Sequence, residues 1–75
     1  MIRAKMQVQS VTKLAGGDEI VKLSAVYGGS TNAEDNSFSK ATPQASLEMY
    51  VSNPLAQGKL LPGRKYYLDF TEAAD

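Results

Sequence analysis

Glu48 and Asp69 are the residues of this chain that come nearest to acid–base chemistry, because its 75 residues include no His and no Cys. Alternation places both carboxylates on the outward faces of strands that we expect to be neighbours. The composition excludes a Ser-His pair, a thiolate nucleophile and an ordinary zinc site. A chain of this length also leaves little room for a water-excluding pocket. The sequence therefore predicts a protein that is not an enzyme and holds no metal and no cofactor.

The segment from Gly16 to Ile20 reads Gly-Gly-Asp-Glu-Ile. It resembles the Gly-Gly-Asp-Glu-Phe signature of nucleotide cyclases that make cyclic di-GMP, which implies a turn between two strands that holds metal and nucleotide. Those cyclase domains need a longer chain with helices covering the sheet, and Ile20 replaces the aromatic residue. Two glycines also suit a plain hairpin turn, and this is the interpretation that the sequence favours.

Two further segments have the right residue types for ligand binding but the wrong spacing. Residues 58–59 are similar to the end of a phosphate-binding loop, yet Asn53 stands where the first glycine belongs and Leu60 where the Ser or Thr belongs. Residues 34–36 offer oxygen ligands of the kind that Ca²⁺ takes, but their spacing matches no ion-binding loop. We expect a helix end at the first segment and a solvated loop at the second.

Four tyrosines, Tyr27, Tyr50, Tyr66 and Tyr67, could stack nucleic-acid bases. Alternation predicts that Tyr66 points inward and Tyr67 outward, which leaves two or three of them exposed. The formal net charge is +0, with eight basic and eight acidic residues. Affinity for nucleic acid depends strongly on basic patches, so a nucleic-acid partner is not expected.

Period-two alternation predicts four strands, over residues 2–14, 19–27, 44–51 and 65–71. The phase of the first strand slips near Ser10, which indicates a β-bulge. Residues 15–18 form a turn that joins the first two strands into an antiparallel hairpin. Pro62 and Gly63 predict a type II turn before the last strand.

The segments between these strands are polar or begin with turn residues. Residues 28–40 read as one long loop, rich in Gly, Asn, Asp and Ser, with Phe38 pinning its end to the core. Asn53 is expected to cap a short helical turn in which Leu55 plugs one end of the core. Phe70 is expected to fill the core as well. The fold class predicted for residues 1–75 is a single all-β domain, an antiparallel barrel or sandwich of about four to five strands with one short helical turn.

Length and hydropathy limit where such a domain acts. No apolar run approaches the roughly 20 residues that a membrane-spanning helix needs, and the N-terminal residues show no apolar signal region. The absence of Cys fits a reducing compartment. We therefore expect the protein to be located in the host cytoplasm and to become part of a virus particle if it is a virion protein. No membrane partner is expected.

Several segments together are similar to small uncharacterised proteins encoded by tailed phages and prophages. The resemblance rests on the Ala-Val-Tyr-Gly segment at residues 25–28, the Asn-Pro turn at 53–54, the Pro-Gly turn at 62–63 and the Tyr-x-x-Asp-Phe ending at 66–70. It covers most of the chain and offers no catalytic residues. It implies a phage-encoded accessory protein.

Two functions follow as hypotheses. The first is a structural or assembly protein of the virion, such as a capsid decoration or head–tail accessory protein. The second is a phage protein that inhibits or sequesters a host protein or a nucleotide signal, and a small-barrel binder of single-stranded nucleic acid is a weaker third. We expect a protein partner, with a homo-oligomer or a small nucleotide ligand as alternatives. The predicted binding residues lie in the polar loop and beside the Pro-Gly turn: Ser30, Thr31, Asn32, Glu34, Asp35, Asn36, Phe38, Arg64, Lys65 and Tyr67.

Overall fold

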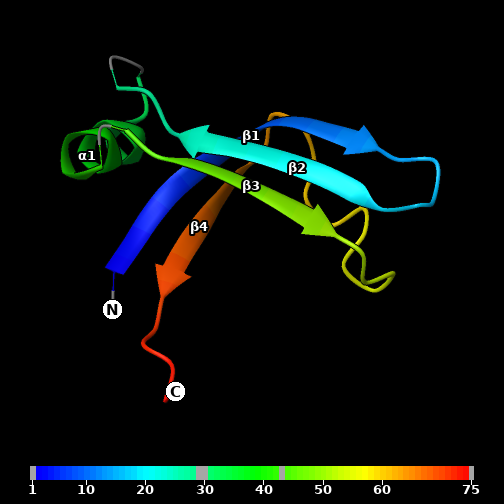
Figure 1. Ribbon diagram of the computed structural model, residues 1–75. Coiled ribbons are helices and arrows are strands. Elements are labelled where there is room, and N and C mark those ends of the chain that lie inside the picture. Colours follow the sequence, from blue (N-terminus) through cyan, green and yellow to red (C-terminus); the bar gives the residue numbers. More distant parts are fainter. Residues whose placement is uncertain (1, 29–30, 43, 75) are drawn as a thin grey trace.

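The computed structural model describes residues 2–28, 31–42 and 44–74. Its elements are β1 (Ile2–Lys13), β2 (Glu19–Ala25), α1 (Ala33–Ala41), β3 (Ser46–Val51) and β4 (Lys65–Phe70). The strands form one sheet in the order β3-β2-β1-β4 with every neighbouring pair antiparallel (Figure 1). The prediction of a mostly β chain with four strands is confirmed. The described strands do not close into a barrel, because β3 and β4 each have one neighbour and remain as free edges.

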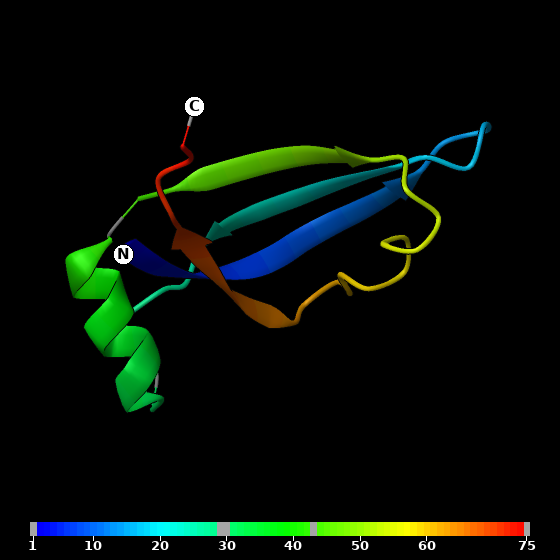
Figure 2. The same ribbon diagram turned by 90° about the horizontal axis from the view of Figure 1, so that it is seen from below.

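β1 is one of the two inner strands of the sheet and the longer of them. Its first half pairs with β4 and its second half with β2, and Met6 faces both Ala25 and Tyr66. The register shifts between Val8 and Ser10, where the sequence predicts a bulge. A bulge bends and twists its strand, and the sheet accordingly curves into an arch (Figures 1 and 2).

Both predicted glycine turns are confirmed. The Leu14 N–H donates to the Asp18 carbonyl at 2.8 Å, and Gly17 takes a φ of 98°. The Arg64 N–H donates to the Leu61 carbonyl at 3.2 Å, and Gly63 takes a φ of 81°. This positive φ at the third position is what a type II turn requires.

The core lies on one face of the sheet and is small. Its buried apolar residues are Ala4, Met6, Val8, Val21, Leu23, Ala25 and Val26. The molecule measures 39 × 34 × 17 Å, and its Cα radius of gyration is 13.7 Å, whereas a compact domain of this length has about 11 Å. The chain is therefore a thin, curved layer rather than a sphere.

The prediction of one long loop over residues 28–40 is wrong, because α1 occupies most of that stretch. Asn32 accepts a hydrogen bond from the Asp35 N–H at 3.1 Å and so caps the helix. Glu34 and Asp35 lie in the first turn and Lys40 in the last, which complements the helix dipole. Asn, Asp and Ser were interpreted as loop formers, but the same side chains are the preferred helix N-caps.

Asn53 forms the expected turn: its side chain accepts from the Leu55 N–H at 3.0 Å and its carbonyl from the Ala56 N–H at 2.9 Å. The two core roles predicted nearby are wrong. Leu55 is 83% exposed in this turn, and Phe70 is 55% exposed at the end of an edge strand. Large apolar side chains therefore remain on the surface.

Candidate functional site

α1 packs on the polar face of β1 and β4 through a group that we call the polar cluster: Lys5, Glu34, Asp35, Lys65 and Tyr67. The Lys5 ammonium lies 2.7 Å from Glu34 Oε1 and 2.7 Å from Asp35 Oδ1. Lys65 pairs with the other oxygen of Asp35. The Tyr67 hydroxyl donates to Glu34 Oε1 at 2.6 Å. Asp35 is 2% exposed, so its carboxylate is held by two ammonium groups away from solvent.

The ionisation equilibria of the polar cluster follow from these contacts. Hydrogen bonds from Lys5 and then Lys65 lower the pKa of Asp35, and a hydrogen bond from Lys5 lowers the pKa of Glu34. The same contacts raise the pKa of Lys5, with Asp35 as the main cause. The hydrogen bond to Glu34 raises the pKa of Tyr67. All of these shifts favour the charged, paired state with a neutral tyrosine.

An aromatic contact and a second ion pair flank the polar cluster. The rings of Phe38 and Tyr67 have centroids 5.9 Å apart. The Arg3 guanidinium lies 4.7 Å from the centre of the Tyr67 ring and donates to both oxygens of Asp69, at 2.6 and 3.0 Å. Phe38 thus packs on β4 rather than on the apolar core.

The structure brings together five of the predicted binding residues, Glu34, Asp35, Phe38, Lys65 and Tyr67. Their polar groups bond to one another and to Lys5, so they hold α1 on the sheet. Sequence reasoning did not select Lys5, and its place in the alternation of the first strand, on the same face as Arg3, was the available signal.

Each of the other predicted binding residues that the structure describes has its own place. Thr31 is exposed, Asn32 caps α1 and Asn36 is half-buried. Arg64 is exposed at the Pro-Gly turn. Ser30 lies outside the described residues.

The expectation that Glu48 and Asp69 lie on neighbouring strands is wrong, because β3 and β4 form opposite edges of the sheet. Glu48 lies 3.6 Å from Lys22 on β2, and Asp69 bonds to Arg3 on β1. Across the described ranges, no three Asp or Glu residues are grouped as a metal site would require. No pair of carboxylates is thus arranged for acid–base work at these positions.

Glu19, the acidic residue of the Gly-Gly-Asp-Glu-Ile segment, has a structural contact. It is 6% exposed, accepts a hydrogen bond from the Gly58 N–H at 3.1 Å and lies 3.6 Å from the Lys13 ammonium. The two segments that resemble nucleotide-binding motifs therefore contact each other. Their contact fixes the 53–58 turn against the start of β2.

Tyr66 and Tyr67 point to opposite faces of the sheet, as alternation predicts. The Tyr66 hydroxyl accepts from the Leu61 N–H at 2.9 Å and donates to the Lys59 carbonyl at 3.1 Å. Tyr67 contacts α1 on the other face. Tyr27 and Tyr50 are 73% and 65% exposed. The adjacent tyrosines Tyr66 and Tyr67 therefore do not form one surface on which bases could stack.

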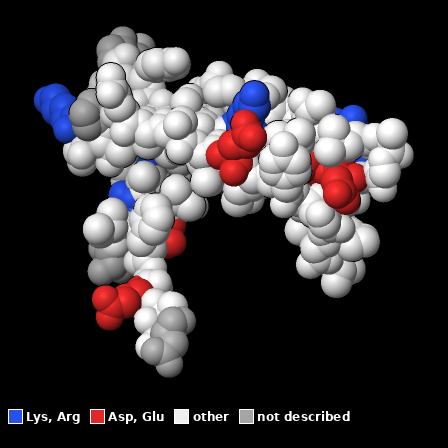
Figure 3. All heavy atoms as spheres, viewed as in Figure 1, with Lys and Arg blue, Asp and Glu red and all other residues white. Residues whose placement is uncertain are grey.

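The apolar face of the sheet, opposite α1, is only partly covered. We call its accessible part the open face: Ile2, Leu47, Met49, Leu68 and Phe70. Ile2 is 70% exposed and Met49 37% exposed. Residues 52–61 cross one end of this face, where Leu60 packs on the core. The space-filling view shows the molecule hollowed between the end of β4 and the 52–59 segment (Figure 3).

A shallow cavity of about 110 Å³ lies on this apolar side, lined mainly by Met6, Leu23, Leu47, Met49, Leu60, Tyr66 and Leu68. Small-molecule sites usually enclose roughly 300–1,000 Å³ with several polar groups for orientation. The cavity is smaller and almost wholly apolar. It suits an apolar side chain of another protein better than a nucleotide.

Comparisons of the chain with models of protein families, with curated proteins and with solved structures give no match. Within the described part of the chain, α1 is the sole helix, and it lacks the length and apolar character needed to cross a bilayer. Function is therefore inferred from the polar cluster and the open face.

Proposed function

We propose that this chain is a non-enzymatic structural or assembly protein that binds another protein through the open face. The observation that carries the proposal is the exposure of Ile2, Met49 and Phe70, together with the half-buried Leu68, on one side of a thin sheet. Soluble monomers rarely leave large contiguous apolar patches uncovered, and such patches mark interaction sites.

Energetics support the same proposal. Burial of apolar surface contributes roughly 25 cal/mol per Å². Among the described residues, the large side chains that are fully buried are Met6, Val8 and Val21, so this contribution is small. A sheet with one apolar face is stable when a second layer covers that face. We propose that a partner supplies this layer and completes a sandwich, which the chain does not build by itself.

We further propose that the protein is an accessory protein of a tailed phage, acting in the host cytoplasm or in the particle. The sequence resemblance to small phage proteins supports the origin. A phage protein that inhibits a host protein could use the same open face. A nucleotide ligand is less favoured, because the cavity of about 110 Å³ on the apolar side is small and almost wholly apolar.

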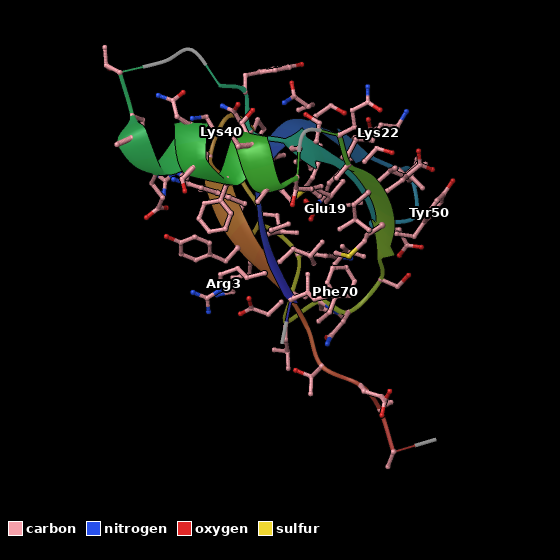
Figure 4. All side chains as sticks on the ribbon, turned by 90° about the vertical axis from the view of Figure 1, so that its left-hand side faces the viewer. Arg3, Glu19, Lys22, Lys40, Tyr50 and Phe70 are labelled. Carbon is pink, nitrogen blue, oxygen red and sulfur yellow. The ribbon has the colours of Figure 1, made fainter. Side chains whose placement is uncertain are left out.

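A photo-crosslinking amino acid in place of Phe70 tests the proposal. The control places the same amino acid at Tyr50, which is similarly exposed but lies on the other face of the sheet (Figure 4). In phage-infected cells and in purified particles, we expect crosslinks from position 70 to one virion protein and few from position 50. Crosslinks from position 70 to a host protein would favour the function of a host inhibitor over that of an assembly protein. Equal labelling from both positions would overturn binding through the open face.

A further inference from the structure

The outer side of β4 is a free edge with a defined set of backbone groups. The Val8 N–H donates to the Arg64 carbonyl at 3.0 Å, and the register then pairs Met6 with Tyr66. Backbone groups of successive residues in a strand point alternately to its two sides, so residues 64, 66, 68 and 70 bond to β1. Residues 65, 67 and 69 therefore direct their N–H and C=O groups away from the sheet.

The side chains at these outward-facing positions are Lys65, Tyr67 and Asp69, and all three residues are exposed. Among the described residues, no backbone hydrogen bond outside the sheet occupies them. Natural proteins commonly protect such an edge with Pro, with a bulge or with charged side chains, Lys above all. The β4 sequence Lys-Tyr-Tyr-Leu-Asp-Phe contains no Pro, and its outward-facing charged residues are one Lys and one Asp rather than charges of a single sign. Its two charges have opposite sign and lie equally far from Tyr67.

We propose that two copies of this chain pair antiparallel through β4 about a two-fold axis at Tyr67. In this register, Tyr67 faces Tyr67 of the second copy, and Lys65 faces Asp69 of the second copy in both directions. All the facing positions present backbone groups outward, so each facing pair exchanges hydrogen bonds. Opposite charges directly across from each other stabilise a strand pair, and a two-fold contact uses the same patch twice.

The ion pairs within each chain extend this charge pattern across the contact. Asp69 is bonded to Arg3, and Lys65 is bonded to Asp35. Pairing places Asp69 of one copy between its own Arg3 and Lys65 of the other. The charges then alternate in sign along the row that runs from Arg3 and Asp69 of one copy to Lys65 and Asp35 of the other.

The other free edge does not offer this complementarity. The Ala25 N–H donates to the Ala45 carbonyl at 3.0 Å, so the odd-numbered residues of β3 bond to β2 and residues 46, 48 and 50 point outward. The symmetric pairing that uses all three positions places Glu48 opposite Glu48 of the second copy. Like charges directly opposite destabilise a strand pair, so β4 is the edge that favours self-association.

The contact also joins the two open faces. The two four-stranded sheets become one continuous sheet of eight strands. On its apolar side, the same register puts Tyr66 across from Leu68 of the second copy. The contact itself uses the edge of β4 and not the open face, so the inference stands independently of the proposed function.

A chemically synthesised chain with an N-methyl group on Tyr67 tests the contact while every side chain is kept. The matched control carries the N-methyl group on Tyr50, an outward-facing tyrosine on the other free edge. Light scattering over a concentration series should give twice the mass of one chain for the unmodified protein and for the Tyr50 form. The Tyr67 form should give the mass of one chain at the same concentrations, with unchanged circular dichroism.

An unmodified chain that stays monomeric up to millimolar concentration would overturn the inference, as would a dimer that survives methylation at Tyr67. A dimer lost on methylation at Tyr50 would place the contact at β3 instead and overturn it too. These readouts use the isolated protein and do not depend on crosslinks from Phe70 to a partner. Failure of the dimer and failure of the proposed function are therefore distinguished.

Discussion

The ammonium group of Lys5 on β1 lies 2.7 Å from the carboxylate of Asp35 on α1, and the two side chains are 11% and 3% exposed. Buried charges are tolerated when they are paired and hydrogen-bonded. Lys65 supplies a second positive charge to the same carboxylate. Asp35 therefore joins α1 to both β1 and β4.

Asp35→Asn should loosen α1 from the sheet. The amide cannot compensate two ammonium groups, and removal of one partner leaves buried charge unpaired. We expect the melting temperature to fall by at least about 4 °C, a readily measured shift for a domain of this size, and amide exchange to rise in residues 33–41. The control is Glu72→Gln, since Glu72 is exposed beyond β4. Equal melting temperatures for the two variants would contradict the role of Asp35.

The polar cluster also predicts how stability depends on pH. The pKa values of Glu34 and Asp35 are lowered in the folded state, so their contribution is present above the unfolded values near 4 and is lost as pH falls through the folded values. The pKa values of Lys5 and Tyr67 are raised. Their contribution is complete below the unfolded values near 10 and is lost as pH rises through the folded values.

The free energy of unfolding should therefore be nearly constant between about pH 5 and 9 and fall outside that range. Urea unfolding at a series of pH values measures it. In Asp35→Asn the fall on the acid side should become shallower, because one carboxylate with a lowered pKa is gone. An unchanged acid slope in that variant would contradict the ion pairing.

Gly17 and Gly16 provide a test of the hairpin turn. Gly17 has a φ of 98°, whereas Gly16 does not have a positive φ, and an added Cβ would meet no atom within 4 Å at either position. Gly17→Ala should thus cost roughly 1–2 kcal/mol through backbone strain alone. Gly16→Ala should be neutral or slightly stabilising. Chemical denaturation compares the two, and equal stabilities would show that the turn relaxes.

The strands and their turns could be predicted from the sequence because each is a local pattern. Alternating side chains mark the first strand, and the slip in their phase near Ser10 marks its bulge. The turn before β4 follows from Pro62 and Gly63 alone. α1 was missed because the residues from Asn32 to Ser37 favour caps and loops equally. The helix is further stabilised by the contact of Asp35 with Lys5, a residue far away in the sequence that no local pattern reveals.

The open face could not be predicted for a related reason. Alternation shows which side of each strand is apolar, but it does not show whether another layer covers that side. Leu55 and Phe70 were expected in the core because both are large and apolar, and there is no second layer in the described structure to bury them. The polar cluster is partly predictable from the sequence, which singles out Lys65, Tyr67 and residues 34 and 35. The sequence assigns them to the binding of a partner, whereas in the structure they bond to one another and to Lys5.

Substitutions of Met6 and Leu55 test which apolar side chains contribute to the stability of the core. Met6 is 1% exposed at the junction of β1, β2 and β4, whereas Leu55 is 83% exposed. Met6→Ala should cost about 2–5 kcal/mol, which is a large part of the stability of a small domain. Leu55→Ala should change stability by less than about 0.5 kcal/mol. Thermal unfolding of both variants measures the difference. A Leu55→Ala variant as unstable as Met6→Ala would mean that Leu55 is buried in solution. The 53–58 turn would then cover part of the open face.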